Sequence, residues 1–136
     1  MPTDASPSIR LDGSADLAFV DALLDDLDRL WDLAPGIADE DRLLFGLAVS
    51  EIATNIAEHS PTEARISAEV IASAGSLRAE LRDTAPAARV DLSTPMPGAD
   101  AESGRGLALS TSVLDELRHE TTGAGNVWTL VRQLRS

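Results

Sequence analysis

The spacing of apolar residues changes partway along the chain, and this change limits the possible folds more than any other feature. Between Ser14 and Pro61, apolar side chains recur at spacings of three and four, as on helices with one buried face. From Ala64 to Asp83 they alternate with polar side chains, as in strands with one face against a core. The alternating stretch therefore predicts a two-stranded antiparallel hairpin with one buried and one solvated face.

Capping and turn residues set the expected boundaries of these elements. Ser14 is a candidate N-cap for a first helix that ends near Ala34-Pro35-Gly36. Asp39 opens a second helix, which stops before Pro61 because the proline ring disfavours helical geometry in the preceding residue. Strands are expected at 9–11, 64–72, 77–83, 116–120 and 127–134. We expect an α+β fold, a two-layer α/β sandwich with a mixed, mainly antiparallel sheet covered on one face by helices.

Length and composition fit a single domain spanning residues 1–136, with a mobile lead-in at 1–7. The net charge of −12 and the absence of lysine argue against direct nucleic-acid binding, which needs a basic surface. The chain has no cysteine, which excludes disulfides and thiolate metal sites. It has no run of ~20 apolar residues and no secretory pattern at its start, so we expect a cytoplasmic protein without membrane contact.

The second predicted helix carries a polar stripe beside its apolar ridge. Glu51, Asn55 and His59 recur every four residues and therefore share one narrow line on the helix. A carboxamide oxygen can ligate Mg²⁺, and a carboxylate one turn away can take a proton from a hydroxyl. The stripe indicates the wall of a site or, equally well, the solvated face of an ordinary amphipathic helix.

A second candidate residue closes the predicted hairpin of strands 64–72 and 77–83. The alternation of the second strand places Asp83 on the buried side, where a carboxylate is costly unless something hydrogen-bonds to it. This indicates a functional role. The alternative is that Asp83 simply begins the next turn, as aspartates often do.

A long stretch without periodicity follows, from Thr84 to Ser103, and a stretch of this length is more typical of a lid than of a plain connector. It leads to Gly104, Arg105, Gly106 and Leu107, directly before an apolar run. Glycines before a helix let backbone N–H groups approach a phosphate, although small loops of this kind are also frequent without that role.

Taken in this order, the pieces resemble the GHKL ATP-binding superfamily and, within it, the anti-sigma-factor serine kinases of bacterial partner switches. Glu51, Asn55 and His59 are similar to that family's N-box. The resemblance implies that Glu51 is the base that activates a substrate serine and that Asn55 is a ligand of Mg²⁺. Asp83 stands where the family's adenine-binding aspartate closes a strand.

The resemblance continues toward the end of the chain. The segment of Gly104, Arg105, Gly106 and Leu107 is similar to the second glycine box, which wraps the phosphates beneath a mobile lid. Gly125-Asn126 stands where relatives often carry Gly-Thr, whose threonine helps to hold the base.

The resemblance implies an anti-sigma regulatory factor, a serine/threonine protein kinase that uses ATP and Mg²⁺. Its implied partners are an anti-anti-sigma protein of STAS type and a sigma factor, and relatives suggest a homodimer. The chain departs from the family after Asp83, because Ala85 and Ala87 stand where glycines are usual. Two alternatives therefore stay open: a non-catalytic module of the same fold that regulates a partner by occupancy, and an unrelated small α/β protein.

Overall fold

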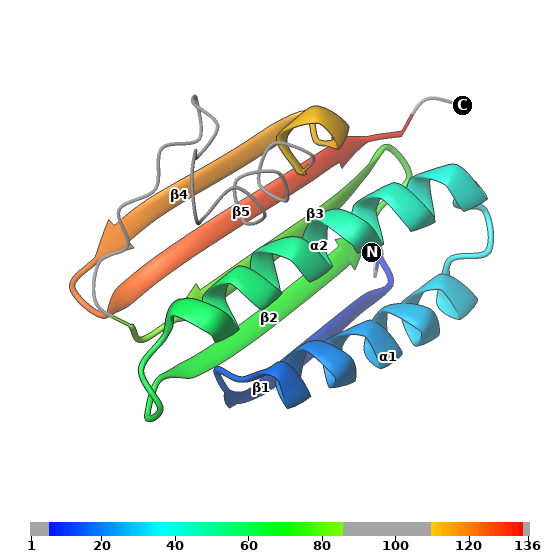
Figure 1. The fold of residues 1–136 in the computed structure, drawn as a ribbon. Helices are drawn as coiled ribbons and strands as arrows, with labels where there is room; N and C mark the ends of the chain where they lie inside the picture. The colour runs from blue at the N-terminus through cyan, green and yellow to red at the C-terminus, as the bar shows by residue number, and fades with distance from the viewer. Residues whose placement is uncertain (1–5, 86–109, 135–136) are drawn as a thin grey trace.

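The computed structural model describes residues 6–85 and 110–134, which form a sheet with two helices on one face (Figure 1). In chain order the elements are β1 (Ser8–Ser14), α1 (Leu17–Leu33), α2 (Asp39–His59), β2 (Arg65–Ala72), β3 (Ser76–Asp83), β4 (Glu116–Thr122) and β5 (Gly125–Gln133). The sheet has the strand order β1-β2-β3-β5-β4. Neighbouring strands in this described sheet are all antiparallel, so the predicted α+β sandwich is confirmed without the parallel pairing of a mixed sheet.

The first helix begins later than the sequence predicts. Asp16 is the N-cap of α1, because its carboxylate accepts the backbone N–H of Phe19 at 2.9 Å. Ser14, the predicted cap, is instead the last residue of β1 and pairs with Arg65 of β2. The pairing of β1 with β2 therefore extends the strand beyond the expected 9–11 and moves the start of the helix.

The second helix has the expected boundaries. It begins at Asp39 and carries three acidic residues in its first turn, where the positive end of the helix dipole favours carboxylates. It ends at His59, and Ser60 takes the extended conformation that a residue before proline favours. The polar stripe is therefore helical along its whole length.

The core lies between the sheet and the two helices. On β2 and β3 the buried positions alternate as predicted, and they are Ile66, Ala68, Val70, Ala72, Leu77, Ala79, Leu81 and Asp83. They pack with buried side chains of both helices, among them Leu23, Phe45 and Ile52. Asp83 is the one carboxylate in this row. The N-terminal lead-in is described only from Ser6, and the carbonyl of Pro7 accepts the N–H of Ala72 at 2.9 Å, which ties it to β2.

The last two strands do not follow chain order in the sheet, because β5 lies between β3 and β4. The predicted hairpin of β4 and β5 is confirmed, with Thr122 paired to Gly125 at its turn. Asn126 pairs with Asp83 on one side and with Thr121 on the other. This register gathers the end of β3, the start of β5 and the end of β4 at one end of the sheet.

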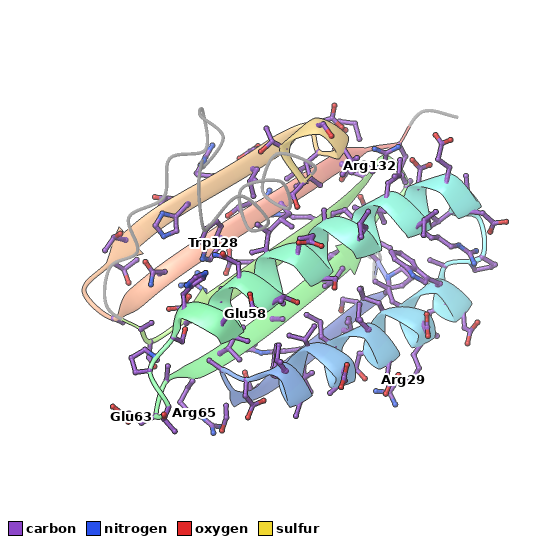
Figure 2. The ribbon with its side chains drawn as sticks, in the orientation of Figure 1. Arg29, Glu58, Glu63, Arg65, Trp128 and Arg132 are labelled. Carbon is purple, nitrogen blue, oxygen red and sulfur yellow. The ribbon has the colours of Figure 1, made fainter. Side chains whose placement is uncertain are left out.

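Arg132 joins β5 to two other parts of the structure. Its Nε donates to Oδ1 of Asp41 in α2 at 2.8 Å, and its Nη1 donates to the carbonyl of Val113 at 2.6 Å. The side chains of Arg132 and Asp41 are only 16% and 14% exposed. Val113 belongs to a short helical turn, residues 110–113, which leads into β4 (Figure 2). Arg132 thus holds α2 and this turn against the end of β5.

We expect Arg132→Gln to lower the free energy of unfolding by about 1–3 kcal/mol, because a shielded carboxylate and a carbonyl lose their donors. Urea unfolding followed by circular dichroism measures this loss. Arg82→Gln is the matched control, since Arg82 makes a similar 2.7 Å contact with Glu80 but its side chain is 58% exposed. That variant should change stability by less than about 0.5 kcal/mol. Equal losses in the two variants would contradict the bridging role of Arg132.

Candidate functional site

Asp83 is the centre of a hydrogen-bonded cluster at one end of the sheet. Its side chain is 6% exposed and lies on the face that the helices cover. Its Oδ1 accepts two hydrogen bonds, one from the backbone N–H of Ala85 and one from Nδ2 of Asn126, both at 2.9 Å. Its Oδ2 makes no hydrogen bond with the described residues and is not enclosed. A carboxylate held by one oxygen and open at the other is arranged to accept a further donor.

The structure shows both the burial and the turn that the sequence suggests for Asp83, and its functional role stays a prediction. The strand alternation does bury the carboxylate, and the same carboxylate also begins a turn by accepting the N–H of Ala85 two residues later. The turn satisfies one oxygen only. The other oxygen accepts no hydrogen bond from a described residue and is open to a donor from outside, which favours a ligand-binding role.

Asn126 is the side-chain partner of Asp83, and the sequence alone does not reveal this contact. It is 2% exposed, and its Nδ2 donates to Oδ1 of Asp83 and to the carbonyl of Ala85 at 3.3 Å. Its Oδ1 lies 3.0 Å from Nε2 of His119. Because the amide nitrogen faces two oxygen acceptors, the amide oxygen faces His119, and Nε2 of that ring must be the donor.

His119 is a site residue that the sequence analysis missed. It lies on β4, and its ring packs on Trp128 of β5 with centroids 4.5 Å apart and planes tilted by 45°. Trp128 is 1% exposed and lies between β5 and α2 (Figure 2). Its Nε1 is buried without a hydrogen-bond partner among the described residues. A buried indole N–H usually has a hydrogen-bond partner. The N–H of Trp128 therefore indicates that this part of the site lacks an acceptor.

Gly125 allows β5 to approach β3 at the site. Its φ of +143° is a conformation that residues with a Cβ rarely adopt, and a Cβ there would lie 1.9 Å from the carbonyl oxygen of Asp83. Glycine is therefore required for the contact that brings Asn126 against Asp83.

The loop after Asp83 is compatible with alanine at the first departure from the family pattern. Ala85 is buried, and none of the described residues other than glycine has a positive φ. Its N–H contributes directly to holding Asp83. Ala87 and the predicted phosphate loop of Gly104, Arg105, Gly106 and Leu107 lie outside the described residues, so their roles stay predictions.

The polar stripe of α2 lies at the margin of the helix's buried face. Glu51 and Asn55 are half-buried and His59 is exposed. Neither Glu51 nor Asn55 makes a hydrogen bond or ion pair within the described parts of the chain. Because α2 leads into β2, whose Ile66 pairs with Asp83, the C-terminal half of α2 and Asp83 lie toward the same end of the sheet (Figure 1). The structure thus places the stripe and Asp83 on one face without a direct hydrogen bond between them.

No helix within residues 6–85 and 110–134 is long and apolar enough to cross a membrane. These residues also contain no group of three or more His, Cys, Asp or Glu side chains that could hold a metal ion.

Comparison with known families agrees with this architecture. The model of the histidine kinase-like ATPase domain matches residues 14–132, which include both helices, the cluster around Asp83 and the stripe of α2. This chain belongs to the histidine kinase-like ATPase domain family. The match supports the GHKL superfamily and its ATP binding, and it leaves the anti-sigma branch as a proposal. A search of curated proteins found no significant match.

The approach of β5 to β3 can be tested at Gly125. Gly125→Ala should lower the free energy of unfolding by about 3 kcal/mol, because the new methyl group must displace the backbone of Asp83. Gly123→Ala in the same turn is the matched control, since its Cβ would meet nothing within 4 Å. Thermal or urea unfolding of both variants measures the difference. Similar stability of the two variants would show that the close contact is not required.

Proposed function

We propose that this domain binds ATP and Mg²⁺ and phosphorylates a serine of an anti-anti-sigma partner of STAS type, thereby controlling a sigma factor. The observation that carries the proposal is the state of Asp83, which is buried, held through Oδ1 and open at Oδ2. The exocyclic amine of adenine is a donor that matches such an acceptor. The family match over residues 14–132 supports the nucleotide as the ligand.

The described residues fit an adenine nucleotide. Asp83 offers one acceptor on the helix-covered face, and close to it in the sheet Trp128 offers an apolar ring and an N–H without a partner among the described residues. Asp83 pairs with Asn126, two residues before Trp128, so the acceptor and the indole lie in neighbouring rows of the same face. A flat, mostly apolar base with a few polar edges needs this kind of wall.

Asn55 is the residue that would hold Mg²⁺. Its carboxamide oxygen is a hard, neutral ligand. The Asn55 side chain is half-buried and makes no hydrogen bond with another described residue. Mg²⁺ commonly takes few protein ligands and completes its shell with water and substrate phosphates, so a single amide is compatible with such a site. The metal would supply neutralisation of charge on the phosphates.

Glu51 would be the base. In the transfer, the serine oxygen forms a bond to the γ-phosphorus, the bond from that phosphorus to the β–γ bridging oxygen breaks, and ADP leaves. The hydroxyl proton passes to the carboxylate of Glu51. Because Glu51 makes no ion pair with a described residue, its carboxylate is available for this proton.

The nucleotide can be tested through protein stability. ATP and Mg²⁺ at about a hundredfold excess over Kd should stabilise the domain by about 2.7 kcal/mol, which a thermal melt detects as a higher Tm. Asp83→Asn should lose most of this shift, because the amide presents a donor where Oδ2 would accept the adenine amine. Glu80→Gln, on the opposite face of β3, is the control and should keep the shift. An unchanged Tm of the wild type would reject the nucleotide.

The kinase activity can be tested separately from binding. Glu51→Gln should bind ATP and the partner normally while phosphate transfer falls by about a hundredfold or more, because the proton acceptor is lost. Labelled ATP with an anti-anti-sigma domain from the same genome measures the transfer. Glu40→Gln, an exposed residue at the other end of α2, is the control and should retain transfer. If the wild type binds the partner but transfers nothing, regulation by occupancy replaces the kinase.

A further inference from the structure

We infer that His119 and Asn126 are positioning residues that set the carboxylate of Asp83 for recognition of the exocyclic amine of adenine. The inference rests on the proposed function, because it concerns how the nucleotide site distinguishes its base. It names two residues that act through Asp83 without contacting the base themselves.

The first step is the contact between Asn126 and Asp83. The N–H of Ala85 reaches Oδ1 of Asp83 from the following turn, whereas Nδ2 of Asn126 reaches the same oxygen from the neighbouring strand. Two donors from two directions fix the plane of a carboxylate better than one, so Oδ2 is held in one place. Oδ2 is the oxygen left for a ligand.

The second step is the orientation of the Asn126 amide. An amide can present either its oxygen or its nitrogen to Asp83, and only the nitrogen is a donor. His119 donates from Nε2 to the amide oxygen at 3.0 Å, which favours the orientation with Nδ2 toward Asp83. The carboxylate of Asp83 and the carbonyl of Ala85 favour the same orientation, so a residue at 119 without a donor would weaken this preference and leave the buried amide oxygen with one bond fewer.

The third step is the placement of His119 itself. In the sheet His119 pairs with Trp128, so it reaches Asn126 along a diagonal and needs a long side chain to do so. The ring of Trp128 packs against the ring of His119, with the two ring centroids 4.5 Å apart. The contacts therefore connect His119 on β4 to Asn126 on β5, and Asn126 to Asp83 at the end of β3.

The experiment compares two probes, ATP and purine riboside 5′-triphosphate, which lacks the exocyclic amine. Calorimetry gives Kd for each probe with the wild type, His119→Phe and His119→Gln. The phenylalanine keeps a ring against Trp128 but lacks the donor, whereas the glutamine keeps a donor. His119→Leu also lacks the donor and replaces the phenylalanine variant if that protein does not fold. Glu120→Gln, on the opposite face of β4, is the control.

We expect the wild type to prefer ATP over the analogue. His119→Phe should weaken ATP binding about fivefold, the effect of one lost hydrogen bond, and leave analogue binding unchanged. His119→Gln should restore most of the preference, and Glu120→Gln should not alter it. Equal weakening of both probes by His119→Phe would show a merely structural role and overturn the inference. A glutamine variant as poor as the phenylalanine variant would overturn it as well.

Two outcomes for the wild type separate this inference from the proposed function. Equal affinity for ATP and the analogue would show that Asp83 does not recognise the exocyclic amine. This result overturns the inference, while nucleotide binding stands. Absence of binding to either probe would overturn the proposed function and the inference with it.

Discussion

The pairing of β3 with β5 at Asp83 and Asn126 is the contact on which the site depends. It joins β5 to β3 within the sheet and brings a buried amide against a buried carboxylate. Gly125 makes the contact sterically possible, because a Cβ in its place would overlap the carbonyl of Asp83. The apolar core fixes the same register from the other end, where Leu77, Ala79 and Leu81 pack beneath the helices. Core packing and site geometry are therefore set by one strand pairing.

The site combines features that stability alone would not favour. A buried carboxylate keeps one oxygen without a partner among the described groups, and a buried indole N–H is likewise unpaired. The buried indole N–H costs free energy relative to a fully satisfied core. Proteins retain such groups where a ligand completes them, and here both lie on the same face of the same two strands. Glu51 and Asn55 of the α2 stripe are half-buried and make no hydrogen bond or ion pair with the described residues.

Local signals in the sequence were sufficient for most of the fold. The boundaries of α2 follow from Asp39 and Pro61, and both hairpins follow from alternation and turns, because these patterns act over a few residues. The exceptions involve partners far away in the chain. The sequence predicts Ser14 as a helix cap, but the pairing of β1 with β2 makes it a strand residue. The sequence also predicts a mixed sheet, whereas β5 lies between β3 and β4 and makes the pairing antiparallel.

The sequence by itself determined that Asp83 is buried and that Glu51, Asn55 and His59 share one line on a helix, because strand and helix periods fix these directions. Only the tertiary structure decided that Asn126 holds Asp83 and that His119 contacts Asn126. Those three residues lie on three strands, and their meeting depends on the register between strands, which no local pattern encodes. The same holds for Ala85, whose N–H helps to hold Asp83 because its backbone adopts an ordinary conformation in the folded turn.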